Sequence, residues 1–225
     1  MRMTTVAAAL LLGACWAHAE KAESERAADG LCPKEKQEGF VCLFDAKTLG
    51  GWQGAVDGYV VEEGKLVCKE HGGGDLYTTK EFGDFVFRFE YKLEPGGNNG
   101  VGVRTPLEGT PGFAAMEIQI LDDSFPNYEK LKPEQFNGSI YGAVPAKRGH
   151  MKPVGEWNAM EIRAKGTQIN VTLNGAVIVD ADTSKLPPKR IHDHDLTGLC
   201  REKGHLAFCG HGHRVEFRNL RIKEL

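Results

Sequence analysis

The segment 85–91 constrains the fold most, because aromatic side chains alternate with other side chains along it. It reads Phe-Val-Phe-Arg-Phe-Glu-Tyr. Successive side chains of a β-strand point to opposite faces of the sheet. The Phe residues and Tyr91 therefore share one face, and Arg88 and Glu90 share the other. This period of two residues predicts a half-buried strand.

Two later segments repeat the alternation. In 101–104 the Val residues flank Gly102, and Arg104 follows on the polar side. In 114–121 a Met and the Ile residues alternate with Glu and Gln. If the three strands lie side by side, they form one polar surface made up of Arg88, Glu90, Arg104, Glu117 and Gln119. Gly102 would then leave room beside Arg104 for a ligand to approach the sheet.

This polar surface has two interpretations. The outer face of an antiparallel sheet is often simply solvated. Solvated faces usually carry Lys, Thr and Ser, whereas Arg, Glu and Gln are well suited to fixing hydroxyl and carbonyl groups. The sequence therefore indicates either a wet face or a binding surface.

The rest of the chain reads as short strands separated by turn signals, with almost no helical periodicity, which predicts an all-β sandwich. The excursion 122–156 is long for a plain connection. It is either a passive crossing loop or a pocket wall that includes Tyr141. The Gly-rich loop 71–75 is a plain connector or a flexible loop over a carbohydrate site. His192 and His194 would share a face and could bind a metal on a strand, but their segment reads as a loop.

The N-terminus resembles a secretory signal peptide over residues 1–19, with Arg2 before a short apolar run and Ala17-His18-Ala19 as a small-x-small cleavage site. We therefore expect an exported protein, periplasmic or extracellular. A lipoprotein anchored at Cys15 is the alternative, since Leu12-Gly13-Ala14-Cys15 resembles a lipobox.

After the leader we expect a linker over 20–38 and a single domain over 39–225. No later segment is apolar enough to predict a transmembrane helix. The formal net charge is −3, so the chain has no excess of basic residues that would indicate nucleic-acid binding. The odd number of cysteines after the leader predicts two disulfides and a free thiol. The candidate pairs are Cys200 with Cys209, and Cys32 or Cys42 with Cys68.

Several motifs carry a resemblance through their order and spacing. They are Leu43-Phe44-Asp45, Gly51-Trp52, Phe82-Gly83-Asp84-Phe85, Arg88-Phe89-Glu90, Asn98 to Arg104, Glu117 to Asp122, Gly155 to Asn158, Leu173-Asn174-Gly175, His211-Gly212 and Phe217 to Leu220. Over 39–225 the chain resembles the 3-keto-disaccharide hydrolase-like domains. That resemblance implies a concanavalin A-like jelly roll, a β-sandwich of two antiparallel sheets. Cys209 departs from the family pattern, in which Gln more usually precedes His-Gly.

The resemblance implies sugar chemistry on the concave sheet face. The run Glu117-x-Gln119-x-x-Asp122 is similar to the Glu-x-Asp-x-x-Glu strand of laminarinase-type glycosidases. Here, however, the middle acid is Gln, and strict alternation puts Glu117 and Asp122 on opposite faces. Ordinary retaining hydrolysis needs two carboxylates about 5–5.5 Å apart, so we do not expect that mechanism.

A ketone at C3 of the sugar offers another route, because it acidifies the C2–H bond. A base can remove that proton and expel the C1 substituent, after which water adds back. We expect Glu117 or His211 as base or acid, with Arg104 or a divalent metal ion polarising the C3 oxygen. No other cofactor is expected. The predicted substrate contacts are Arg88, Glu90, Asn99, Gln119, Asp122 and Tyr141.

Three functions compete for this fold, since a fold does not determine function. The first is an exported enzyme that cleaves 3-keto-glycosides, with a carbohydrate as its partner. The second is a non-catalytic, lectin-like carbohydrate-binding module. The third is a structural or envelope-interaction domain. The sequence leaves the oligomeric state open.

Overall fold

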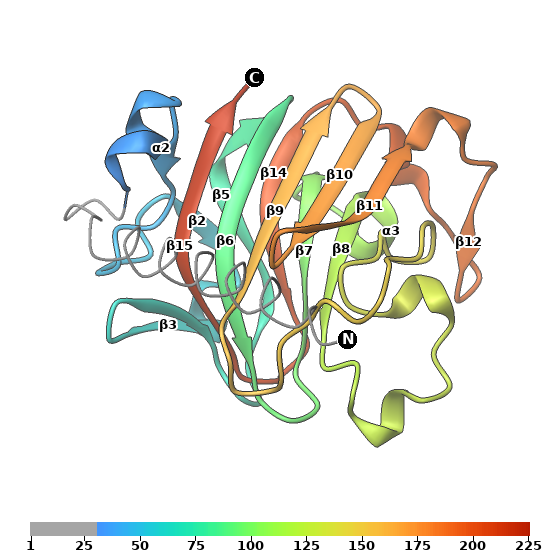
Figure 1. The fold of residues 1–225 in the computed structure, drawn as a ribbon, viewed down its shortest axis with the longest axis horizontal. Helices are drawn as coiled ribbons and strands as arrows, with labels where there is room; N and C mark the ends of the chain where they lie inside the picture. The colour runs from blue at the N-terminus through green and yellow to red at the C-terminus, as the bar shows by residue number, and fades with distance from the viewer. Residues whose placement is uncertain (1–30) are drawn as a thin grey trace, which may run out of the picture.

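The computed structural model describes residues 31–225, whose main strands form two antiparallel sheets (Figure 1). The larger of the two is called the large sheet. Its strand order is β11-β10-β9-β6-β15-β4-β3, with β1 paired to β15. In the small sheet the order is β2-β5-β14-β7-β8. A separate hairpin consists of β12 and β13. The predicted β-sandwich of two antiparallel sheets is confirmed.

The strands of the large sheet are β1 (Val41–Cys42), β3 (Tyr59–Glu62), β4 (Lys65–Cys68), β6 (Phe85–Leu93), β9 (Asn158–Lys165), β10 (Gln168–Leu173), β11 (Ala176–Asp182) and β15 (Val215–Glu224). Those of the small sheet are β2 (Trp52–Gly54), β5 (Gly74–Phe82), β7 (Asn98–Thr105), β8 (Met116–Leu121) and β14 (Gly204–Gly210). The hairpin strands are β12 (Arg190–Ile191) and β13 (His194–Asp195). The helical elements are α2 (Pro33–Gln37), η1 (Val56–Gly58), α3 (Pro111–Ala114), η2 (Pro126–Tyr128), η3 (Pro133–Gln135), η4 (Thr183–Lys185) and η5 (Thr197–Cys200).

Aromatic side chains from both sheets fill the space between them. Phe89 of β6 meets Phe208 of β14 edge to face, with ring centroids 6.3 Å apart. Phe208 also packs on Phe217 of β15 at 4.1 Å. All three rings are almost completely buried. Each buried side chain of this size stabilises the fold by about 1.5–3 kcal/mol, so the alternation that predicted the strands also builds the core.

The prediction that the three polar strands lie side by side is wrong. β7 and β8 are neighbours in the small sheet, but β6 is a central strand of the large sheet. Arg88 and Glu90 therefore lie on the outer face of the opposite layer. Alternation gives the face of a strand, but which strands pair is decided by contacts far apart in sequence.

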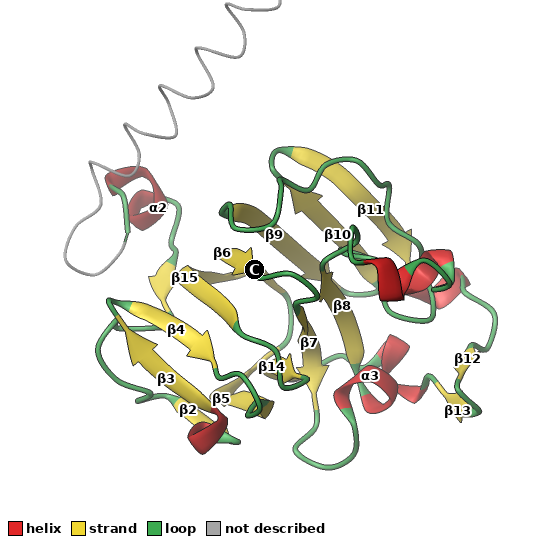
Figure 2. Cartoon of the chain, turned by 90° about the horizontal axis from the view of Figure 1, so that it is seen from below, coloured by secondary structure: helices red, strands yellow, loops and turns green. Residues whose placement is uncertain are grey.

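The excursion 122–156 is not merely a crossing loop, because part of it extends the small sheet. Its Tyr141 N–H donates to the Glu117 carbonyl at 2.8 Å, and the Gln119 N–H donates to the Ser139 carbonyl at 3.0 Å. The stretch 138–141 thus runs beside β8 and covers its outer edge. Figure 2 shows α3 next to β7 and β8, with the β12–β13 hairpin beyond it.

The end of the expected linker is ordered. Helix α2 lies beside β15 (Figure 1), and the buried Glu35 carboxylate accepts a hydrogen bond from the Arg221 guanidinium. The expected signal peptide, the lipobox with Cys15 and the first part of the expected linker lie outside the described residues. Within 31–225, no helix is both long and apolar enough to cross a bilayer.

The predicted disulfides are absent, since all five cysteines between residues 31 and 225 are free. The fold places them in different surroundings. The Cys42 thiol donates to the Phe44 carbonyl at 2.8 Å. Cys68 is buried beside Tyr59. Cys209 of β14 is buried and lies opposite Asp75 in the neighbouring strand β5, and Cys200 is exposed.

Candidate active site

The outer face of the small sheet carries a cluster of titratable side chains. In β5 and β14, Asp75 lies opposite Cys209. In β7 and β8, Gly102 lies opposite Glu117. Because the intervening residues of these strands point into the core, the named ones share the outer face. The strand order β5-β14-β7-β8 brings them together.

The Glu117 carboxyl is enclosed by backbone from two other elements. A Cβ at Gly100 of β7 would lie 1.9 Å from its Oε1, and a Cβ at Gly112 of α3 would lie 2.7 Å from its Oε2. The side chain is only 6% exposed, and within the described residues Oε1 has no hydrogen-bond partner. Burial, with a smaller contribution from Asp75, raises the pKa of Glu117 to about 8. At neutral pH this group is therefore mainly a protonated acid.

His211 lies at the exposed rim of the same face. The protein packed around its ring lowers its pKa, and His213 adds to that effect while Asp75 opposes it. Burial raises the pKa of Asp75, and a hydrogen bond from Tyr77 and the charge of His211 partly offset this. Tyr77 in turn has its pKa raised to about 12, chiefly by burial. The neutral imidazole of His211 is thus suited to accept a proton.

Tyr141 completes the opposite end of the face. Its hydroxyl accepts a hydrogen bond from Gln135 Nε2 at 3.2 Å and lies 3.1 Å from His192 Nε2. Burial is the largest cause of its raised pKa, and the charge of Glu117 contributes. The excursion 122–156 and the β12–β13 hairpin therefore hold a phenol next to the buried carboxyl.

Gln119 also lies on this face, and its side-chain amide donates to Asn98 Oδ1 at 3.0 Å. The structure thus places Glu117, Gln119, Tyr141 and His211 of the predicted set on one face, and Asp75 interacts electrostatically with both Glu117 and His211. The four predicted residues come from β8, the excursion 122–156 and the end of β14, which are far apart in sequence.

Arg104 has a different position from the one predicted. Its guanidinium donates to the Gly83, Gly166 and Arg201 carbonyls at 2.8–2.9 Å and pairs with Asp84 at 2.9 Å. It is 2% exposed, and its donors tie turns of the two sheets together. Gly102 does not open a path to it, because a Cβ at that position would lie 2.4 Å from Thr105 Oγ1.

The other predicted contacts are held elsewhere. Asn99 is fully buried in the interior, where it interacts with Tyr59 and Cys68. The Asp122 carboxylate accepts hydrogen bonds from the Gly96 and Ser124 N–H groups at 2.9 Å, so it fixes a turn.

Arg88 and Glu90 are engaged on the outer face of the large sheet. Arg88 pairs with Glu161 at 2.6 Å. Glu90 pairs with Arg218 at 2.8 Å. The structure therefore does not bring these two residues to the small-sheet face.

Sequence reasoning missed Asp75 and Tyr77. A signal existed, because Leu76 and Thr78 are the buried partners of an alternating strand that begins at Gly74. The glycines before Asp75 made the segment read as a loop. It is in fact the end of β5, and its glycines allow close packing. A Cβ at Gly73 would lie 2.9 Å from the Gly210 backbone.

A metal ion stays a prediction. Within residues 31–225, no group of three or more His, Cys, Asp or Glu side chains is arranged to hold one. His192 lies in the turn of the β12–β13 hairpin, whereas the His194 ring stacks on Phe113 with centroids 4.3 Å apart. The two imidazoles therefore have separate contacts.

Known proteins resemble this chain in sequence and in fold. A curated 3-keto-disaccharide hydrolase of Bacteroides thetaiotaomicron is 28% identical over 84% of this chain and 79% of its own length. A Parabacteroides distasonis protein, named only as a candidate glycosyl hydrolase, superposes with a TM-score of 0.73 at 27% identity, covering 87% of this chain and 98% of its own. The Bacillus subtilis carbohydrate binding module CBM66 shares the fold alone, with a TM-score of 0.51 at 12% identity over 77% of this chain and 96% of its own.

A family model covers nearly the whole described domain. The 3-keto-alpha-glucoside-1,2-lyase-like domain matches residues 39–223. The chain therefore belongs to the family of 3-keto-alpha-glucoside-1,2-lyase-like domains, as its motifs indicated.

Proposed function

We propose that this protein cleaves 3-keto-glycosides by eliminating the C1 substituent and then adding water. Family membership makes the chain a glycoside-cleaving enzyme of the hydrolase type, so that prediction is confirmed. The name of its Bacteroides relative supports a 3-keto-disaccharide as substrate. The observation that carries the proposal is the grouping of His211, Asp75 and Glu117 on one sheet face.

In the proposed reaction His211 is the general base. It takes the proton from C2, and the electron pair of that bond enters the C2–C3 bond to give the C3 enolate. The enolate re-forms the ketone as the C1–oxygen bond breaks, which leaves a C1–C2 double bond. Two observations support His211 in this role, its lowered pKa and its position on the exposed rim.

Glu117 is the proposed general acid, because its carboxyl is protonated at neutral pH. Its proton goes to the departing oxygen. Water then adds to C1 and a proton returns to C2, so the overall reaction is hydrolysis. Groups whose environments push their pKa values in opposite directions are typical acid and base pairs.

The developing charge on the C3 oxygen needs a donor. Arg104 was the predicted donor, but its guanidinium is engaged with Asp84 and three backbone carbonyls. We assign this task to the Tyr141 hydroxyl, which Gln135 and His192 hold beside the face. Gln119 would bind a sugar hydroxyl. A divalent metal, if bound, would supply further polarisation of the C3 oxygen.

The test is release of a chromogenic group from a 3-keto-glucoside, with and without EDTA. We expect His211→Ala and Glu117→Gln each to lower kcat by about 100-fold or more, the usual contribution of a positioned acid or base. Loss of activity with EDTA would establish the metal. Full activity in both variants would contradict the assignment. Binding of ordinary oligosaccharides without any release would favour the lectin-like alternative.

Export is part of the proposal. Residues 1–19 would direct the chain to the periplasm or the medium, with the Cys15 lipoprotein as the alternative. Fractionation of the native host, with mass spectrometry of the mature N-terminus, distinguishes the two. An N-terminus at Glu20 supports simple cleavage, and an acylated Cys15 supports the anchor. Retention of Met1 in the cytoplasmic fraction would contradict both.

A further inference from the structure

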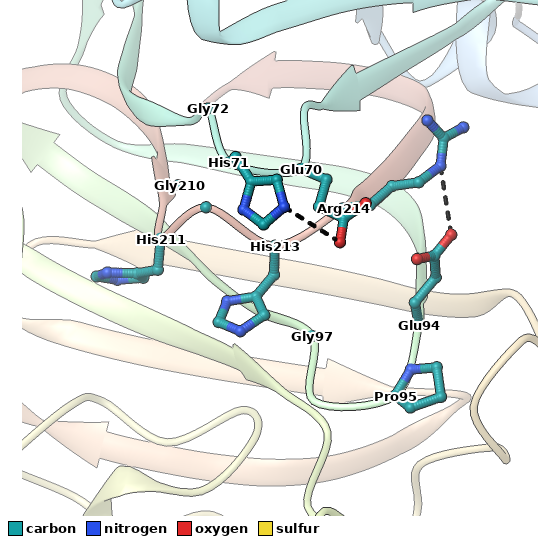
Figure 3. A pocket seen from close by; sticks show the side chains of 11 residues that line it. Glu70, His71, Gly72, Glu94, Pro95, Gly97, Gly210, His211, His213 and Arg214 are labelled. Atoms are coloured by element: carbon teal, nitrogen blue, oxygen red, sulfur yellow. Dashed lines mark ion pairs between the residues drawn. The ribbon is translucent and has the colours of Figure 1, made fainter.

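Cys209 lies on β14, the central strand of the small sheet, with β5 on one side and β7 on the other. Its neighbour Phe208 packs in the core, so alternation turns the Cys209 side chain to the outer face. The chain then leaves the strand at His211, which borders a pocket together with His71 and His213 (Figure 3). Cys209 therefore shares the outer face with the proposed acid and is close in sequence to the proposed base.

Next to the Glu117 carboxyl, β7 and β14 present only small residues. The outward positions of β7 are Gly100 and Gly102, which have no side chain, and Ala207 of β14 lies opposite Gly102. Cys209 is the remaining outward side chain of β14 there, and a thiol is only a weak hydrogen-bond donor. Within the described residues, the buried Oε1 of Glu117 has no hydrogen-bond partner. These two strands thus give the carboxyl no strong side-chain donor.

Cys209 and Glu117 are close enough to affect each other electrostatically. Burial raises the pKa of the Cys209 thiol well above its usual value, and the charges of Glu117 and then Asp75 raise it further. The Gly102 N–H, on the residue opposite Glu117, also interacts with the Cys209 sulfur. Asp75 of β5 and Tyr141 of the excursion 122–156 interact with Glu117 in the same way. None of these three groups is a cation that would stabilise a carboxylate at Glu117.

We propose that Cys209 is a positioning residue for the general acid: its neutral thiol occupies the face between Asp75 and Glu117 without a strong donor, so Glu117 keeps its proton until the leaving oxygen takes it. The inference rests on the proposed function. A hydroxyl or amide in place of the thiol would donate to the carboxylate and favour its charged form. Glu117 would then lose its proton at a lower pH. Cys209 therefore sets the upper pH at which the enzyme still has its acid.

An infrared titration tests this role without any turnover. The carbonyl band of a protonated carboxyl, identified as the band that Glu117→Gln lacks, reports the pH at which Glu117 ionises. Cys209→Ser replaces the thiol with a hydroxyl, and we expect it to lower that pH by about one unit, the value of a hydrogen bond to a charged group. Cys209→Ala adds no donor and should titrate as the wild type does. Cys200→Ser, at an exposed cysteine, is the matched control and should also leave the titration unchanged.

The pH dependence of kcat/KM on the chromogenic 3-keto-glucoside gives a second measurement, because it reports the acid and base of the free enzyme. We expect the basic limb of this profile to move to lower pH in Cys209→Ser by the same amount as the infrared titration. The basic limb of Cys209→Ala should stay at the wild-type position. A merely structural role of Cys209 would instead lower kcat/KM at every pH and leave the limb in place.

The two measurements separate the role of Cys209 from the proposed function. An unshifted infrared titration in Cys209→Ser, or an equal shift in Cys209→Ala, would overturn the role of Cys209 even in an active enzyme. A shifted titration with an unmoved basic limb would show that Glu117 is not the acid of the reaction. If the wild-type enzyme releases nothing from the 3-keto-glucoside, the proposed function fails, and the infrared titration alone decides whether Cys209 keeps the proton on Glu117.

Discussion

Glu117 is the residue whose chemistry the fold changes most. Its neighbours Gly100 and Gly112 lack side chains, which lets two backbone segments close over its carboxyl. Alternation alone predicted its face correctly, together with that of Gln119. It also gave the outer face of Arg88 and Glu90 correctly, but their strand pairs within the other sheet, so these two residues do not join the small-sheet surface. The residue pattern predicts which face of its strand a side chain occupies, whereas the sheet topology decides which other strands lie beside it.

The raised pKa of Glu117 predicts a pH-dependent stability. Between the ordinary value of 4.5 and about 8 the folded state holds a proton that the unfolded chain releases, so folding stability falls as the pH rises through this window. Glu117→Gln removes that loss. We expect its free energy of unfolding, relative to wild type, to rise between pH 5 and pH 8 by on the order of 3 kcal/mol.

Urea denaturation at the two pH values measures this difference. Glu129→Gln, a matched substitution at an exposed site, should show no comparable change. A difference for Glu117→Gln that is independent of pH would show that the carboxyl is ionised in the folded protein at pH 8 as readily as in the unfolded chain.

Arg104 gives a second prediction at the residue scale, because its hydrogen bonds hold turns of the fold together and do not face the active site. Arg104→Met leaves Asp84 and three carbonyls without their donor. We expect a loss of about 3 kcal/mol in folding stability, with kcat per folded molecule reduced less than 5-fold. Active-site titration combined with thermal denaturation separates the two effects. A stable but inactive variant would instead return Arg104 to the catalytic role predicted from sequence.

At the scale of elements, α3 and β7 determine the position of the Glu117 carboxyl. Gly100→Ala would place a Cβ 1.9 Å from Glu117 Oε1, so the carboxyl must move. The backbone at Gly100 needs no left-handed conformation, so the strand itself tolerates alanine. We expect kcat to fall by more than about 10-fold, because small misplacements of catalytic groups are costly, and Tm to fall only slightly.

Gly83→Ala, in the turn between β5 and β6, is the matched control for this substitution. A Cβ there meets nothing closer than the Glu202 carbonyl at 3.5 Å. Its kcat should equal that of wild type. Wild-type kcat in Gly100→Ala would show that the position of Glu117 between β7 and α3 is not needed for turnover.

The long excursion shows what element lengths can and cannot predict. Its length indicated a functional role, and Tyr141 within it does reach the site. The pairing of 138–141 with β8 was not predictable, since isolated bridges such as Ile118 with Ile140 leave no periodic signal. The hairpin that places His192 against Tyr141 is equally short.

At the scale of the whole molecule, the sandwich follows from the sequence more completely than the site does. Short alternating strands and turn signals require two sheets that bury their aromatic faces against each other. The site depends on which strands meet at the outer face of the small sheet, and this is decided by contacts between β5, β14, β7 and β8. The family resemblance supplied the chemistry. Alternation placed Arg104 on the polar surface, but its guanidinium is engaged with Asp84 and backbone carbonyls, and Asn99, expected to bind substrate, is buried in the interior.

The central claim is that the C2 proton is removed before the C1 bond breaks, and a substrate deuterated at C2 tests it directly. We expect glycoside cleavage by the wild-type enzyme to show a primary isotope effect, and the 3-keto sugar released in ordinary water to carry hydrogen at C2. A no-enzyme sample corrects for spontaneous exchange. Cleavage at an unchanged rate with deuterium fully retained at C2 would contradict the account, because it would require direct displacement at C1.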